Sequence, residues 1–122
     1  MRVLVTGGRD YADVAAVFDE LDRIRNGNLA FVVINGGASG ADKLARDWCL
    51  KRCVEFMTVP ADWKRWGRSA GPRRNQRMLE AIGKPDLVVA FPGGDGTQDM
   101  INRALRAGVR VHIYEPHRES RA

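Results

Sequence analysis

The chain has 122 residues, of which 44% are hydrophobic and 29% are charged, and its formal net charge is +5. A chain of this length can bury one hydrophobic core but not two, and no apolar run approaches the roughly 18–20 residues that a membrane-spanning helix needs. The N-terminal residues enter a predicted strand instead of a signal peptide, so we expect a cytoplasmic protein without a membrane partner. We expect one domain at residues 1–115, followed by a polar tail at 116–122.

The hydrophobic periodicity predicts strands that alternate with helices. In chain order it indicates a strand at 2–6, a helix from 14 to about 26, a strand at 30–34, a helix through 44–49, a strand at 54–59, a loop at 60–72, a helix from about 72 to 83, a strand at 86–91, a helix from about 97 to 108, and a strand at 109–114. This alternation predicts an α/β fold with a single Rossmann-like, doubly wound, parallel sheet of five strands. The expected strand order is 3-2-1-4-5, which opens a crevice beyond the first and fourth strands.

Glycine-rich loops follow three of these strands. Their candidate ligand-binding residues are Gly7, Gly8, Arg9 and Asp10 in the first loop, Gly36, Gly37, Ser39 and Asp42 in the second, and Pro92, Gly93, Gly94, Asp95, Gly96 and Thr97 in the third. Glycine lets main-chain N–H groups come close to an anion, and the following helix N-terminus carries a partial positive charge. Each loop alone can equally be a tight turn. Because the carboxyl ends of parallel strands share one edge, we expect all three loops to meet there around a small phosphate-bearing ligand.

The residues between the third strand and the following helix are basic and aromatic. From Trp63 to Leu79 the chain holds six basic residues and no acid: Lys64, Arg65, Arg68, Arg73, Arg74 and Arg77. Such a segment favours an anionic partner, either a phosphate-bearing small molecule or a nucleic-acid backbone, and its plain alternative is a solvated charged surface. Trp63 or Trp66 can stack on a base or pack over the sheet edge.

Other side chains offer little chemistry. Cys49 and Cys53 lack neighbouring ligands, and His112 and His117 lie far from any acidic cluster, so no metal site and no cofactor other than a nucleotide-type ligand is predicted. No glycine is followed by Lys and then Ser or Thr, so there is no Walker A loop. The dinucleotide fingerprint fails at Asp99, where its third glycine would fall.

Five motifs together resemble the YspA and YpsA-related branch of the SLOG superfamily. They lie at residues 6–11, 36–42, 62–63, 70–78 and 91–97, and the resemblance runs from Val3 to about Tyr114. It implies a domain that binds nucleotides or nucleotide-derived ligands, such as relatives of ADP-ribose, and that senses or generates them. It also implies a ligand contact from Arg74 and Asn75, and a homo-oligomer, because relatives commonly form dimers or larger assemblies.

The third loop also resembles the LOG phosphoribohydrolases, which cleave the N-glycosidic bond of nucleoside monophosphates. Residues 92–97 match the first six positions of the signature Pro-Gly-Gly-x-Gly-Thr-x-x-Glu, but Met100 stands in the place of the glutamate. Methionine can neither activate water nor stabilise a cationic transition state. An N-glycosidase is therefore the alternative function, with Arg74, Arg77 and Asp99 as candidate catalytic residues. Asp99 is turned about 100° from Met100, so we expect it to act only if the helix start is reoriented.

The residue types suggest how a ligand would be held. Main-chain N–H groups of residues 93–97, together with Gly7 and Gly8, are expected to bind phosphate oxygens, and Arg9 and Arg74 to pair with them. Asp10 and Asp42 are candidates for ribose hydroxyls, and Thr97 either caps its helix or touches the ligand. A second alternative is single-stranded nucleic-acid binding, based on the aromatic and basic segment and on the remote similarity of the superfamily to the DNA-processing protein DprA.

Overall fold

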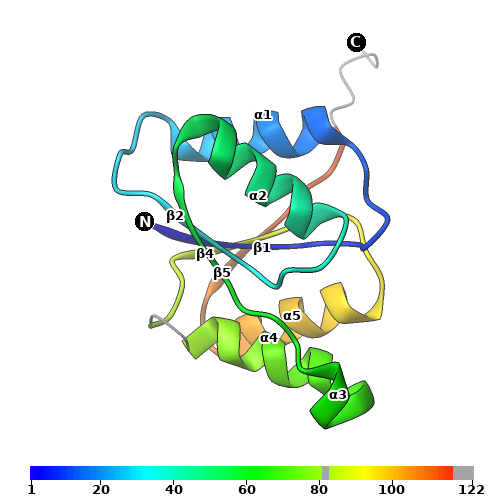
Figure 1. Ribbon diagram of the computed structural model, residues 1–122. Coiled ribbons are helices and arrows are strands. Elements are labelled where there is room, and N and C mark those ends of the chain that lie inside the picture. Colours follow the sequence, from blue (N-terminus) through cyan, green and yellow to red (C-terminus); the bar gives the residue numbers. More distant parts are fainter. Residues whose placement is uncertain (81–82, 117–122) are drawn as a thin grey trace.

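The computed structural model describes residues 1–80 and 83–116 (Figure 1). Its elements are β1 (Arg2–Thr6), α1 (Val14–Arg25), β2 (Val32–Asn35), α2 (Ala41–Arg52), β3 (Glu55–Thr58), α3 (Trp63–Trp66), the 3-10 turn η1 (Gly67–Ser69), α4 (Ala70–Glu80), β4 (Leu87–Ala90), α5 (Asp95–Arg106) and β5 (Arg110–Ile113). All five strands are parallel and lie in the order β3-β2-β1-β4-β5. The predicted fold class and strand order are confirmed. Most of the predicted tail, 117–122, lies outside the described residues.

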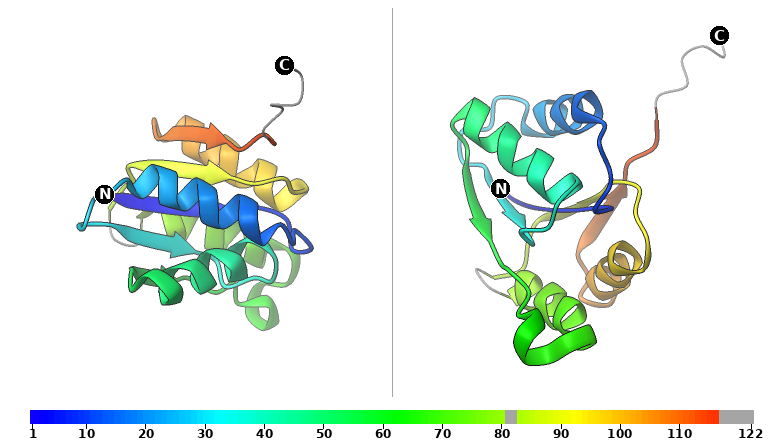
Figure 2. Two further views of the ribbon diagram at one scale, coloured as in Figure 1. Left: turned by 90° about the horizontal axis from the view of Figure 1, so that it is seen from above. Right: turned by 45° about the vertical axis from the view of Figure 1, so that its right-hand side comes forward.

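Helices cover both faces of the sheet. In Figures 1 and 2, α1 and α2 lie on one side, and α4 and α5 lie on the other. Alternate residues of β1 face opposite cores, because successive strand side chains point to opposite faces. Val3 and Val5 pack in the core with α1 and α2, whereas Leu4 packs with Met78 of α4 and Met100 of α5. The continuous apolar runs of the central strands are thereby explained.

The winding of the sheet reverses at β1. This strand pairs with β2 on one side and with β4 on the other, and Thr6 stands opposite Ala90 at the carboxyl ends of β1 and β4. The loops that leave these two strands therefore diverge to opposite faces of the sheet. The carboxyl ends, on the right in Figure 1, form the edge where open α/β sheets bind ligands.

The predicted loop at 60–72 is wrong in part. Residues 63–66 form the short helix α3, η1 follows, and α4 begins at Ala70. Asp62 starts α3, because its Oδ1 accepts a hydrogen bond from the Arg65 amide at 3.1 Å. None of the α3 residues is buried, so the helix has no apolar periodicity that the sequence pattern could reveal.

The start of α5 also differs from the prediction. The helix begins at Asp95, two residues earlier than expected, with Gly94 as its N-cap. Residues 81 and 82, which belong to the helix predicted from about 72 to 83, lie outside the described residues. None of the helices in the described part of the chain is both long and apolar enough to cross a membrane.

Both cysteines are free thiols. Cys49 lies on the buried face of α2, in the core. Burial raises the pKa of its thiol to about 12, so the thiol stays protonated at neutral pH and is a poor nucleophile. Cys53 is exposed and ends α2 in the left-handed conformation, with φ 57°. The structure therefore assigns Cys49 a packing role.

Candidate functional site

A cavity of about 1030 Å³ lies at the carboxyl edge of the sheet. It is bounded by the β1–α1 loop, the start of α5, and the α3–α4 segment, with a small contribution from the β2–α2 loop. Its lining residues are Thr6, Gly7, Gly8, Arg9, Asp10, Tyr11, Ala38, Asp42, Trp63, Arg68, Gly71, Pro72, Arg74, Asn75, Met78, Pro92, Gly93, Gly94, Asp95, Gly96, Thr97 and Asp99. All the predicted ligand-binding residues line this cavity except Gly36, Gly37 and Ser39. Those three line an adjoining cavity of about 280 Å³.

The N-terminus of α5 faces the larger cavity without a side-chain cap. Gly94 is the N-cap, and the first backbone bond into the helix joins the Gln98 amide to the Gly94 carbonyl at 3.0 Å. The amides of residues 95–97 have no backbone acceptor within the described residues. A Cβ built on Gly94 or Gly96 would meet no atom within 4 Å, so this turn is open. Thr97 is not the helix cap, which corrects one of the two roles expected for it.

The first loop packs tightly against the third. The Gly8 amide donates to the Pro92 carbonyl at 2.8 Å, so this N–H is not available to a phosphate, contrary to expectation. A Cβ on Gly8 would lie 3.0 Å from the Pro92 oxygen, and one on Gly93 would lie 2.7 Å from the Gly8 nitrogen. Glycine is required here because two backbones meet, and the contact brings the two loops together at the cavity.

Asp42 organises the second loop. Its Oδ2 accepts hydrogen bonds from the amides of Gly36 at 3.1 Å and Ala38 at 3.2 Å, and the residue is 6% exposed. Burial raises the pKa of this carboxyl, and these two amides and the nearby Arg74 oppose the rise. Oδ2 was expected to accept a hydrogen bond from a ribose hydroxyl, but it accepts from the loop amides instead.

Arg74 joins the second loop to α4. Its Nη1 donates to the Gly36 carbonyl at 2.6 Å and its Nε to Oδ1 of Asn75 at 3.0 Å. Burial lowers the pKa of the guanidinium, Asp42 raises it and Arg9 lowers it further, but arginine remains charged in proteins. Nη2 has no hydrogen-bond partner among the described residues, and Arg74 lines both cavities. One face of this fixed cation is therefore open to an anion.

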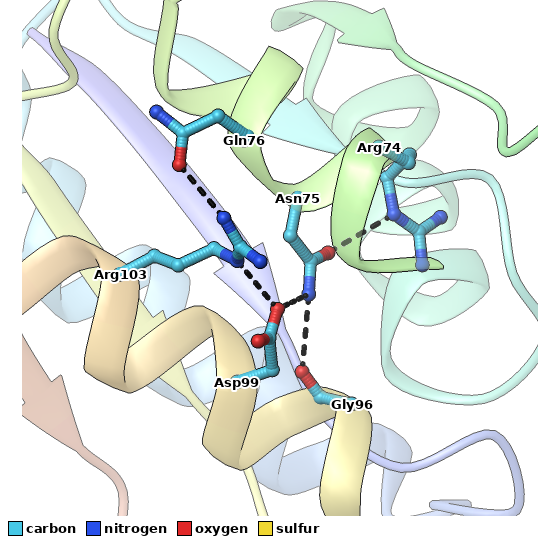
Figure 3. Close-up of polar contacts among 6 residues, drawn as sticks. All are labelled: Arg74, Asn75, Gln76, Gly96, Asp99 and Arg103. Carbon is cyan, nitrogen blue, oxygen red and sulfur yellow. Dashed lines mark hydrogen bonds and ion pairs between the residues drawn. The ribbon is translucent and has the colours of Figure 1, made fainter. Parts of the chain in front are cut away.

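Asn75 connects α4 to the start of α5 (Figure 3). Its Nδ2 donates to the Gly96 carbonyl at 3.2 Å and to Oδ2 of Asp99 at 3.0 Å. Arg103 donates from Nε to the same Asp99 oxygen at 2.8 Å and from Nη1 to Gln76 at 3.0 Å. Asn75 is 3% exposed and both ends of its amide are occupied. Both hydrogens of Nδ2 are thus engaged, and Oδ1 already accepts from Arg74, so in this structure Asn75 positions its neighbours.

The candidate catalytic residues lie in different environments. Met100 is fully buried in the core with Leu4 and Met78, so the position of the LOG glutamate does not reach the cavity. Asp99 lines the cavity, and its Oδ2 is held by Asn75 and Arg103. Arg77 is exposed and lines neither cavity.

The aromatic and basic segment contributes one tryptophan to the site. Trp63 lines both cavities, and the guanidinium carbon of Arg9 lies 5.0 Å from the centre of its ring. Trp66 lies on neither cavity, and the Arg73 guanidinium covers its ring at 3.7 Å. Sequence reasoning left Arg68, Tyr11 and Pro72 out of the site, although each belongs to a motif or segment already singled out.

Within residues 1–80 and 83–116, no group of three His, Cys, Asp or Glu side chains could hold a metal ion. His112 lies away from the cavity, where its Nε2 is 2.7 Å from Oε2 of Glu20. His117 lies outside the described residues.

The parallel sheet, the strand order and a cavity at the reversal point define a Rossmann-like α/β domain. The chain belongs to the YspA, cpYpsA-related SLOG family (YAcAr), which matches residues 1–66. The resemblance to this family is confirmed, and the motifs at 6–11, 36–42 and 62–63 lie within the matched residues.

Two other proteins are similar to this chain over most of its length. The Gene 61 protein of Mycobacterium phage D29 is 38% identical over 118 residues, which cover 90% of this chain and 93% of that protein. The X-ray structure of DNA processing protein A (DprA) from Streptococcus pneumoniae has a TM-score of 0.53 and 18% identity, and the match covers 91% of this chain but 58% of the DprA chain. At this identity the similarity to DprA shows the fold alone.

Proposed function

We propose that this protein binds a nucleotide or nucleotide-derived ligand, such as a relative of ADP-ribose, in the cavity at the carboxyl edge of the sheet. The observation that carries the proposal is the uncapped N-terminus of α5, whose open first turn faces a cavity that Arg9 and Arg74 also line. Main-chain N–H groups at a helix N-terminus and guanidinium groups both favour phosphate. Membership of the SLOG family supports a nucleotide-related ligand.

The size and charges of the cavity are consistent with such a ligand. About 1030 Å³ lies at the upper end of the roughly 300–1,000 Å³ typical of small-molecule sites. The Arg9 guanidinium makes no hydrogen bond or ion pair with another described residue, so it can turn toward a phosphate. Asp10 and Asp95 also line the cavity, and their carboxylates can accept hydrogen bonds from ribose hydroxyls.

Calorimetric titration with AMP, ADP and ADP-ribose tests this proposal. The Arg9→Ala variant should bind the tightest of them at least about tenfold more weakly, because a hydrogen bond to a charged group contributes about 1.5–3 kcal/mol. Arg77→Ala, which removes an exposed arginine outside both cavities, is the matched control and should change the affinity less than about twofold. If no compound binds and none raises the unfolding temperature, the proposal is wrong.

Hydrolysis of the N-glycosidic bond is the second candidate function, favoured by the position of Asp99 on the cavity wall. In this reaction water adds to C1′ of a nucleoside monophosphate, the C1′–N bond breaks, and ribose 5-phosphate and the free base leave. The hydrogen bonds of Asp99 use Oδ2, so Oδ1 is the oxygen that would accept the proton of water. Incubation with nucleoside monophosphates, followed by chromatography, should then release base from the wild type but not from Asp99→Asn. Intact substrate after prolonged incubation with wild type would exclude this activity.

Single-stranded nucleic acid is a third candidate, favoured by the exposure of Trp63 and Trp66 beside several arginines. Stacking of bases on Trp66 would require displacement of Arg73 from its ring. Oligonucleotide affinity that falls steeply with salt, and that is unaffected by ADP-ribose as competitor, would favour this function over the first.

A further inference from the structure

The two cavities at the carboxyl edge are separated by a shared set of side chains. Arg9, Ala38, Trp63 and Arg74 line both the larger cavity and the one of about 280 Å³. Arg9 and Trp63 come from opposite sides, the β1–α1 loop and α3, and stack at 5.0 Å. A molecule that entered both cavities would pass directly beside these residues.

The smaller cavity is built for part of a ligand. Its volume lies just below the roughly 300–1,000 Å³ typical of a complete small-molecule site. The residues that line this cavity alone are Gly36, Gly37, Ser39, Pro60 and Ala61. Together with the Trp63 ring, which belongs to a residue 47% exposed, these surfaces offer a flat aromatic group both apolar contact and stacking.

The boundary between the cavities is cationic. Among the described residues, Nη2 of Arg74 has no hydrogen-bond partner there, and the Arg9 guanidinium contacts the Trp63 ring without forming a hydrogen bond or ion pair. Two guanidinium groups with free N–H donors suit adjacent phosphate groups, because each can form a paired hydrogen bond to phosphate oxygens. The free amides of α5 lie beyond them, in the larger cavity.

We propose that the ligand is a diphosphate with a group at each end, so that it occupies both cavities. The aromatic base lies in the smaller cavity against Trp63, the diphosphate crosses the boundary at Arg9 and Arg74 toward the first turn of α5, and the second sugar lies in the larger cavity. This inference rests on the proposed function and narrows its ligand class from nucleotides and their derivatives to nucleoside diphosphates that carry a second sugar.

Ala61 allows the smaller cavity to be blocked alone, because it does not line the larger one. Calorimetry with ADP-ribose, ADP and ribose 5-phosphate should show that Ala61→Leu lowers the affinity for ADP-ribose and for ADP at least tenfold. The affinity for ribose 5-phosphate, which lacks a base, should change less than twofold. Ala15→Leu, at an exposed position of α1, is the control and should change none of the three affinities.

The outcomes separate this inference from the proposed function. In the wild type, ADP-ribose should bind at least fivefold more tightly than ADP, because only ADP-ribose carries the second sugar. Equal affinities for these two compounds, or no effect of Ala61→Leu on ADP-ribose, would overturn the two-cavity ligand while nucleotide binding stands. If Ala61→Leu does not fold, Ala61→Val places a smaller side chain at the same position and should weaken the binding of ADP-ribose while leaving that of ribose 5-phosphate unchanged. Failure of all three compounds to bind the wild type would overturn the proposed function as well.

Discussion

Nδ2 of Asn75 lies 3.0 Å from Oδ2 of Asp99, so a buried amide on α4 is hydrogen-bonded to the cavity-facing carboxylate of α5. The same nitrogen reaches the Gly96 carbonyl at 3.2 Å, and the amide oxygen holds Arg74. One side chain thus orients the cation of the site and the helix start that faces it. A ligand that binds between them finds both already in place.

Asn75→Ala should lower the free energy of unfolding by about 1–3 kcal/mol, because it leaves the Gly96 carbonyl and Nε of Arg74 without their partner. Urea denaturation measures the loss. The control is Gln76→Ala on the same helix, whose amide pairs with Arg103 and Glu80 at a less buried position, and it should cost less than about 1 kcal/mol. An equal loss of unfolding free energy in the two variants would contradict the larger contribution expected from the hydrogen bonds of Asn75.

Gly96→Ala should separate stability from binding. The added methyl group meets no protein atom and alanine favours the helix, so the free energy of unfolding should stay the same or rise by up to about 1 kcal/mol. The methyl group nevertheless enters the turn that faces the cavity, so AMP affinity should fall. Gly93→Ala provides the contrast: its methyl group would collide with Thr97, and thermal denaturation should show a clear loss of stability. Unchanged AMP affinity in Gly96→Ala would show that the ligand does not approach this turn.

Asp42 offers a pair of matched substitutions. Asp42→Ala leaves the amides of Gly36 and Ala38 without an acceptor and should destabilise the fold by about 1–3 kcal/mol. Asp42→Asn keeps one oxygen in the same position, and in the wild type a single oxygen accepts both bonds. The asparagine variant should therefore lose less stability than the alanine variant in chemical denaturation. The reverse order would mean that the charge of Asp42, not its hydrogen bonds, stabilises the loop.

Glu20 should make stability depend on pH in the acid range. Burial acts to raise the pKa of this carboxyl, but hydrogen bonds and charge from Arg23 and from His112 of β5 outweigh it and hold the pKa below its ordinary 4.5. A carboxyl with a lowered pKa in the folded state stabilises the fold above the unfolded pKa, and this stabilisation disappears as the pH falls through the folded pKa. Glu20→Gln should therefore be less stable than wild type near neutral pH, and the difference should shrink below pH 4.5.

Melting temperatures of the two proteins between about pH 3 and about pH 7 test this expectation. Asp19→Asn, on the same helix, is the control, because Asp19 forms no ion pair within the part of the chain described. A constant difference between Glu20→Gln and wild type over this range would show that the ion pairs of Glu20 contribute nothing.

The parts of the fold that the sequence predicted are those with a local or periodic signal. Apolar runs marked the strands, helical spacing marked α1, α2 and α5, and alternation of the two led to the order 3-2-1-4-5, because right-handed crossovers allow few arrangements. The helix α3 was missed because it buries no residue and so leaves no periodicity. Its cap, Asp62, was the one local signal that could have located it.

The individual roles in the site depend on contacts between distant segments. Glycine at Gly8 predicted a close backbone approach, but only the packed loops show that its amide meets Pro92 instead of a ligand. The motif with Arg74 and Asn75 indicated that both residues belong to the site. Their different roles follow from the packing: Arg74 faces the cavities, whereas the buried Asn75 joins α4 to α5. The sequence by itself determined the fold and the edge at which the glycine-rich loops meet, because hydrophobic periodicity and glycine act on their immediate neighbours. Only the tertiary structure decided which N–H groups and charges remain open, because each buried polar group must find a partner and that partner lies far away in the chain.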